Sequence, residues 1–91
     1  MALKRGMVTE FDCGSVSSEI VCEWKQLGRV LKVPEPRLHC IDLDYQGVQE
    51  KAYQMLLWWR NKFASQASYA ALADGLKRVG KPTVAAIHCC A

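Results

Sequence analysis

The stretch VQEKAYQMLLWWRNKF, residues 48–63, carries the clearest helix signal in the chain. Its apolar side chains recur at intervals of three and four residues, as they do on the buried face of an α-helix. The stripe that they form is longer than three turns and consists of Ala52, Met55, Leu56, Trp59 and Phe63. The stretch therefore predicts an amphipathic helix that packs this stripe against the core of a helical domain.

Trp58 stands next to Trp59 in this helix, and neighbouring residues cannot lie on one face of a helix. If Trp59 belongs to the core, Trp58 is turned about 100° away from it. Two interpretations of Trp58 remain open. It is either half-buried against a neighbouring helix, or a surface aromatic of the kind that is enriched at protein interfaces.

A second amphipathic stretch precedes the first, and its apolar stripe consists of Ile20, Val21, Trp24, Leu27, Val30 and Leu31. Ser17 or Ser18 is predicted to cap a helix that starts at Glu19, since serine is a favoured N-cap. Gly28 lies inside the stripe, where it costs about 1 kcal/mol of helix propensity against alanine. We therefore expect another helix to cross closely at Gly28.

Prolines and glycines divide the rest of the chain into short helices. Residues 33–36, VPEP, end the helix of Trp24 and begin another, because proline is accepted in a first helical turn. Leu38 and Ile41 form the apolar face of this short helix, and residues 42–47 are predicted to be a loop.

Two more helices follow residue 63. Ser68 is predicted to cap the first of them, and Gly80 is its expected C-terminal glycine. Pro82 opens the last segment, with Val84 and Ile87 facing inward. No segment shows a convincing strand pattern, so the chain is predicted to be all-α.

The composition is that of one globular domain: 91 residues, 51% of them hydrophobic. No apolar run approaches the length of about 20 residues that a membrane helix needs. Because no apolar stretch follows the basic N-terminus, we expect no secretory signal and a cytoplasmic protein.

The net charge of +3, from 12 basic and 9 acidic residues, is too small to demand a nucleic-acid partner. One basic cluster nevertheless consists of Lys25, Arg29, Lys32 and Arg37, and a second of Lys77, Arg78 and Lys81. A small all-α nucleic-acid-binding module therefore remains the alternative to a protein-binding domain.

The five cysteines are odd in number and irregular in spacing, which argues for reduced thiols rather than a disulfide framework. None of the short ligand spacings of structural zinc sites is present. His39 beside Cys40 and His88 beside Cys89 do not make a catalytic dyad, because adjacent helical residues point in different directions. The sequence thus predicts no enzyme, no catalytic residue, no cofactor and no metal site.

Several segments together resemble the death domain family. The segment EWKQLGRVLKV, residues 23–33, resembles the second helix of the family, whose usual form is Trp-x-x-Leu-Ala-Arg-x-Leu-Gly-Leu. Leu38 and Ile41 match its third helix. The segments YQMLLWWRNK, residues 53–62, and ASYAALADGL, residues 67–76, resemble its fourth and fifth helices.

The resemblance covers most of the chain, from about Ile20 to Ile87. Its pattern is closest to the tumour-necrosis-factor-type receptors and the Fas-associated adaptor. The predicted death domain spans residues 15–90, and residues 1–14 are predicted to be an N-terminal extension or a poorly matched first helix.

This resemblance implies a six-helix antiparallel Greek-key bundle that binds other death domains, and no enzyme. Members of the family assemble signalling complexes in apoptosis, innate immunity or NF-κB signalling by head-to-tail association. We expect death-domain partners and a possible homo-oligomer, with no nucleic acid and no insertion into a membrane.

The resemblance also implies three interaction surfaces. The residues carried over by position are Lys25, Arg29 and Arg37 on the basic side of one contact, Asp42 and Asp44 on an acidic surface after the third helix, and Trp58 and Lys62 near the corner between the fourth and fifth helices.

Overall fold

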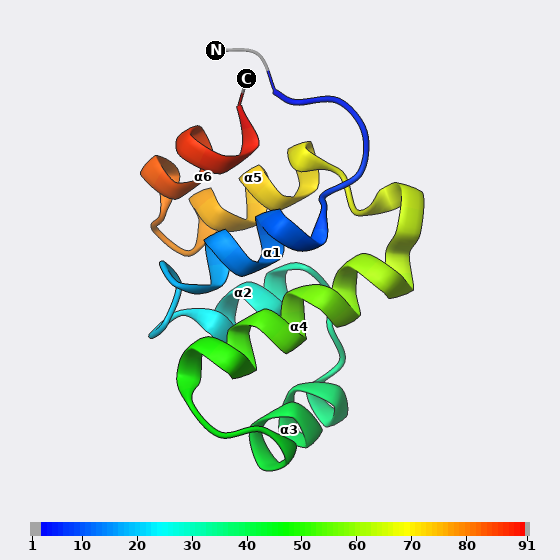
Figure 1. The fold of residues 1–91 in the computed structure, drawn as a ribbon, viewed down its shortest axis with the longest axis vertical. Helices are drawn as coiled ribbons and strands as arrows, with labels where there is room; N and C mark the ends of the chain where they lie inside the picture. The colour runs from blue at the N-terminus through cyan, green and yellow to red at the C-terminus, as the bar shows by residue number, and fades with distance from the viewer. Residues whose placement is uncertain (1–2, 91) are drawn as a thin grey trace.

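The computed structural model of the protein describes residues 3–90, and most of them are helical (Figure 1). The elements in chain order are α1 (Glu10–Ser17), α2 (Trp24–Val30), α3 (Glu35–Asp44), α4 (Val48–Phe63), the 3₁₀ turn η1 (Ala64–Gln66), α5 (Tyr69–Arg78) and α6 (Pro82–Cys89). Extended pairing within residues 3–90 is limited to two isolated bridges, Leu3 with Cys90 and Met7 with Ser68. The prediction of an all-α bundle of six helices is confirmed.

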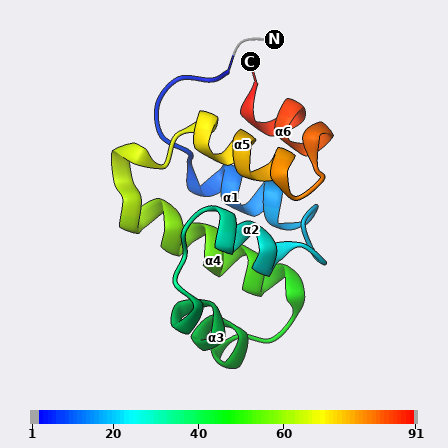
Figure 2. The same ribbon diagram turned by 180° about the vertical axis from the view of Figure 1, so that it is seen from behind.

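The longest helix, α4, packs against α1, α2 and α3, while α5 packs against α2 and α6. Helix α3 packs mainly on α4 and α2, and it lies at one end of the long axis of the molecule (Figures 1 and 2). The segments around Leu3 and Cys90 meet at the opposite end. The bundle therefore has one end where the two ends of the described chain join, and one end made by α3.

The predicted stripe of α4 forms the centre of the core. Ala52, Met55, Leu56 and Trp59 are buried, and Phe63 packs against the core from its edge. The other helices contribute buried side chains to the same core, and these include Val16, Trp24, Leu27, Leu38, Leu72, Leu76 and Ala85. The apolar periodicity of residues 48–63 thus identified the buried side chains of α4, on which α1, α2 and α3 pack.

Gly28 lies where α2 crosses α3 and α4. A Cβ atom at this position would lie 2.7 Å from Leu38 Cδ2 and 3.2 Å from Met55 Cγ. Because the first distance is shorter than van der Waals contact, only glycine fits without a shift of its neighbours. The close crossing expected from the sequence is confirmed.

The first helix takes in part of residues 1–14, the segment predicted to be an N-terminal extension or a poorly matched first helix. The Thr9 hydroxyl accepts from the Asp12 backbone N–H, and the Asp12 carboxylate accepts from the Thr9 N–H, which is a capping box. This cap starts α1 at Glu10 and carries it through Gly14 to Ser17. The predicted domain boundary after residue 14 therefore falls inside α1.

The predicted helix start at Glu19 is wrong. The hydroxyls of Ser17 and Ser18 donate to the carbonyl oxygens of Gly14 and Ser15, at 2.7 and 2.9 Å. The two serines therefore bond back into α1 instead of capping the next helix, and α2 begins only at Trp24.

The loop predicted at residues 42–47 is also wrong in part, because α3 continues to Asp44. Asp42 and Asp44 lie in the last turn of α3 rather than after it. A carboxylate is unfavourable at a helix C-terminus, but the Asp42 carboxylate is held by the ammonium groups of Lys25 and Lys51. These ion pairs offset the helix dipole at the end of α3.

The ends of α5 and the start of α6 follow the sequence. The Ser68 hydroxyl accepts from the Ala71 N–H at 3.1 Å, and Gly80 has a φ of 83° just beyond α5. Pro82 opens α6 as predicted. Ile87 was predicted to face inward, but its side chain is 59% exposed because α6 buries Val84 and Cys89 instead.

Candidate protein-interaction surface

The basic and acidic residues of α2 and α3 lie against each other. Lys25 Nζ on α2 is 2.8 Å from Asp42 Oδ2, and Lys51 Nζ on α4 is 2.6 Å from Asp42 Oδ1. Hydrogen bonds from Lys25 and Lys51 lower the pKa of Asp42 to about 2. The structure thus joins Lys25 and Asp42, which the sequence had assigned to two different surfaces, in one intramolecular ion pair.

Arg29 is also engaged within the chain. Its Nε donates to Glu35 Oε1 at the start of α3, and this hydrogen bond raises the pKa of Arg29. Both side chains are more than half exposed, at 51% and 64%. Because exposed pairs of this kind contribute little, Arg29 can exchange Glu35 for another carboxylate at small cost.

Arg37 differs from these two cations. Its guanidinium lies 5.7 Å from the ring centroid of Trp58, and it forms no ion pair with a carboxylate of residues 3–90. Trp58 is half-buried beside α3, as the first of its two interpretations predicted, and the second, a role at a protein interface, stays a prediction. A cation on the face of a tryptophan is held by the ring quadrupole while it keeps its own charge exposed.

A shallow hollow of about 220 Å³ opens beside this pair. Its lining residues are Pro34, Pro36, Arg37, Cys40 and Trp58. Two proline rings, an indole and a thiol make the hollow mostly apolar, and the guanidinium supplies a positive rim. We call these five residues the Arg37–Trp58 corner.

The remaining predicted residues, Asp44 and Lys62, are exposed and lie on different helices. Asp44 lies at the end of α3, and neither side chain forms an ion pair with another described residue. Leu43, beside Asp44, is 71% exposed. Leu43 was not among the residues predicted from the sequence, although its offset of two residues from Ile41 already turns it away from the buried face.

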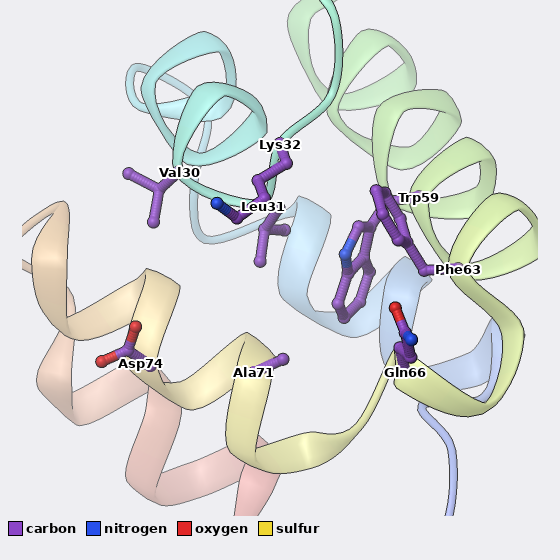
Figure 3. A pocket seen from close by; sticks show the side chains of 8 residues that line it. All are labelled: Val30, Leu31, Lys32, Trp59, Phe63, Gln66, Ala71 and Asp74. Atoms are coloured by element: carbon purple, nitrogen blue, oxygen red, sulfur yellow. The ribbon is translucent and has the colours of Figure 1, made fainter.

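A second hollow, of about 240 Å³, lies between α2, α4 and α5 (Figure 3). Trp59 and Phe63 of α4 line one side, and Leu31 at the end of α2 lines another. Lys32 and Asp74 stand at its edges. Asp74 is already paired with Arg78 at 2.9 Å, so this hollow offers an apolar surface with one cation, unpaired among the described residues, at its rim.

The most buried charged group of residues 3–90 is the Asp12 carboxylate, which lines neither hollow. Asp12 is 7% exposed, and its carboxylate accepts hydrogen bonds from Thr9 and from the Tyr69 hydroxyl. Burial alone would raise its pKa, but the hydrogen bonds from Tyr69 and Thr9 outweigh burial, so the pKa of Asp12 is lowered. Burial and the Asp12 carboxylate raise the pKa of Tyr69 to about 12. This network joins α1 to α5 and serves the fold.

The thiols divide into two groups. Cys13 and Cys89 are buried, and burial raises their pKa to about 12 and about 11. Thiols of this kind are poor nucleophiles and behave as small apolar side chains. Cys22 and Cys40 are exposed, and Cys90 is half-buried.

The part of the chain that the structure describes contains no group of three His, Cys, Asp or Glu residues placed to hold a metal ion. No helix in residues 3–90 combines the length and the apolar character needed to cross a membrane. What the surface does offer is charge, apolar hollows and the Arg37–Trp58 pair, which are means of binding another protein.

Comparison with known families supports this conclusion. A model of the Death domain family matches residues 14–87 of the chain. No curated protein matches the chain in a sequence comparison. The chain belongs to the death domain family, and its six helices form the antiparallel Greek-key bundle of that family.

Death domains are protein–protein interaction modules that bind other death domains. The similarity to tumour-necrosis-factor-type receptors and to the Fas-associated adaptor stays a prediction.

Proposed function

We propose that this protein binds other death domains through the Arg37–Trp58 corner and so helps to assemble signalling complexes of apoptosis, innate immunity or NF-κB signalling in the cytoplasm. The observation that carries the proposal is the pairing of Arg37 with Trp58 beside an apolar hollow. Arginine and tryptophan are the residue types most often found at the energetic centre of interfaces.

The corner combines two kinds of contact. The hollow of about 220 Å³ would take an apolar side chain of the partner, and the Arg37 guanidinium would pair with a neighbouring carboxylate. Because Trp58 already holds Arg37 in place, little side-chain entropy is lost when the partner binds.

The other predicted residues have lesser parts in this proposal. Lys25, Arg29 and Asp42 would have to give up their partners within the chain, so we expect them to steer the approach of a partner more than to add affinity. Asp44 and Lys62 are exposed at other places on the surface. We propose that they contact further death domains, since unlike surfaces build open head-to-tail assemblies.

Capture of a panel of purified death domains tests the proposal, with Arg37→Glu compared with Lys77→Glu. Lys77 is an exposed cation of α5 without an ion pair among the described residues, so the two variants change the net charge equally. Arg37→Glu is expected to weaken capture at least about tenfold, and Lys77→Glu to leave it unchanged.

Equal loss in the two variants, or capture of no death domain at all, would contradict the proposal. A binding measurement with duplex DNA tests the alternative, a small all-α nucleic-acid-binding module. Tight binding to DNA that weakens steeply with salt would instead favour a nucleic-acid-binding module.

A further inference from the structure

The outward face of α3 carries complementary groups at equivalent distances from its middle. Leu38 and Ile41 face the core, so the opposite side of the helix carries Pro36, Cys40 and Leu43. Arg37 and Asp44 border this apolar strip. All five of these outward side chains are exposed, and Leu43 is 71% exposed.

The spacing of these residues follows from helix geometry. Pro36 and Leu43 are seven residues apart, as are Arg37 and Asp44, and seven residues are close to two full turns. The members of each pair therefore lie on the same side of α3, about 10 Å apart along its axis. Cys40 lies midway, because it is four residues from both Pro36 and Asp44 and three residues from both Arg37 and Leu43.

With this arrangement, α3 of one copy is complementary to α3 of a second copy that runs in the opposite direction. When two α3 helices lie antiparallel about a two-fold axis at Cys40, Arg37 of one copy lies beside Leu43 and Asp44 of the other. The same contact is repeated on the other side of the axis. Leu43 of each copy then lies against Pro36 of its mate, at the edge of the Arg37–Trp58 corner.

The charges of this face are available for such a contact. Neither Arg37 nor Asp44 forms an ion pair with another residue in the range 3–90. Helix α3 lies at one end of the molecule, so a second copy can approach it without meeting α1, α5 or α6 (Figures 1 and 2).

From this face we infer that the protein forms a closed dimer in which α3 packs antiparallel against α3 of a second copy, held by two Arg37–Asp44 ion pairs. The dimer covers the Arg37–Trp58 corner, so it competes with the binding of other death domains. The competition rests on the proposed function, whereas the dimer itself does not.

Sedimentation of two charge variants, first alone and then mixed, tests the dimer. Arg37→Glu alone sets two carboxylates against each other at both contacts of the dimer, and Asp44→Lys alone sets two cations against each other there. Each variant is therefore expected to dimerise at least about tenfold more weakly than the native chain.

In the mixture, a dimer of one Arg37→Glu copy and one Asp44→Lys copy keeps one native Arg37–Asp44 pair. Its second contact is an ion pair with the signs reversed, a carboxylate at position 37 against an ammonium group at position 44. The dissociation constant of this mixed dimer is therefore expected to lie within about threefold of that of the native dimer. Assemblies larger than a dimer, or no recovery on mixing while circular dichroism shows both variants folded, would overturn the inference.

Thiol crosslinking locates the axis. A short bismaleimide should link two copies through Cys40, because the two thiols lie across the two-fold axis. Cys40→Ser is expected to abolish the linked dimer, while Cys22→Ser, which removes the other exposed thiol, is expected to keep it. A linked dimer that survives Cys40→Ser would place the contact elsewhere.

The two proposals fail separately. If the dimer is absent and a foreign death domain is still captured, only the dimer is refuted. If the dimer forms and no death domain is captured, the proposed function is refuted and the dimer stands.

Discussion

The polar groups at the two ends of the molecule differ in burial: at one end a carboxylate is buried and hydrogen-bonded, and at the other the charged groups are partly or largely exposed. At the end where the described chain begins and finishes, the Lys4 N–H donates to the Cys89 carbonyl at 2.9 Å and the Val8 N–H to the Ala67 carbonyl at 2.9 Å. Beside them, the buried Asp12 carboxylate is bound by Thr9 and Tyr69. At the α3 end, Arg37 and Asp44 stay exposed, without ion pairs to other described residues.

This difference separates stability from recognition. Buried polar groups that are satisfied within the chain hold the fold, and they are costly to disturb. Exposed charged groups contribute little to folding and remain free to meet a partner. Substitutions at the first end should therefore change the free energy of unfolding, and substitutions at the α3 end should change binding.

The largest effect is expected on α4, whose neighbouring tryptophans face different ways. Trp59→Ala leaves a cavity in the core. It is expected to lower the free energy of unfolding by about 3–5 kcal/mol, which is most of the stability of a domain of this size. Trp58→Ala should cost clearly less, because Trp58 is only half-buried. Urea unfolding followed by circular dichroism measures both. Equal costs would mean that the two residues are not divided between core and surface.

Asp12 provides the next test, with Asp44 as its matched control. Asp12→Ala leaves the Tyr69 hydroxyl and the Thr9 N–H without their acceptor, and is expected to cost about 2–3 kcal/mol. Asp44→Ala should stay within about 0.5 kcal/mol of the native chain. If the two variants unfold at the same urea concentration, the contrast between the two ends is refuted.

The Asp12 contribution also depends on pH. Because the folded state lowers the pKa of Asp12, the contribution is complete above the unfolded value of 3.8 and is lost as the pH falls through the folded value. Stability should therefore fall below about pH 4 in the native chain, and less steeply in Asp12→Asn. Urea midpoints measured across the acidic range would show the difference, and parallel curves would contradict it.

Alkaline pH should lower the free energy of unfolding through Cys89, which lies at the same end of the molecule. Folding raises the pKa of this thiol from 9.0 to about 11, chiefly by burial. The contribution is therefore complete below the unfolded pKa and declines as the pH rises toward the folded one, by about 2–3 kcal/mol. Cys89→Ala should flatten the decline between these values. An unchanged slope in this variant would mean that other groups control alkaline unfolding.

The smallest effect is expected at Arg29. Its ion pair with Glu35 is exposed on both sides, so Arg29→Ala should leave the midpoint of thermal unfolding unchanged within error. A clear loss of stability would show that ion pairs at the α3 end also hold the fold, and would weaken the contrast between the two ends.

Much of the fold was predictable because it depends on local periodicity. The stripe of residues 48–63 and the caps at Ser68 and Gly80 are properties of short stretches of chain, and all of them are confirmed. The start of the helix of Trp24 was placed too early, at Glu19, because Ser17 and Ser18 suit either an N-cap or bonds back into the preceding helix. Only the geometry of the backbone distinguishes the two.

The candidate site was less predictable than the fold. The sequence marked Lys25 and Asp42 as charged surface residues, but it did not show that these side chains, 17 positions apart in the chain, lie 2.8 Å apart in space. Nor did it show that Arg37 lies on the ring of Trp58. Contacts between helices depend on how the helices cross, and this is not encoded in any one stretch.

The sequence alone thus determined that the chain is a helical death domain, and that Trp59 belongs to its core while Trp58 faces another way. These features depend on the spacing of apolar residues along single helices. The tertiary structure decided which charges are neutralised within the chain and which remain exposed on α3. That division arises only when α2, α3 and α4 pack together, because an ion pair requires two side chains within about 4 Å of each other.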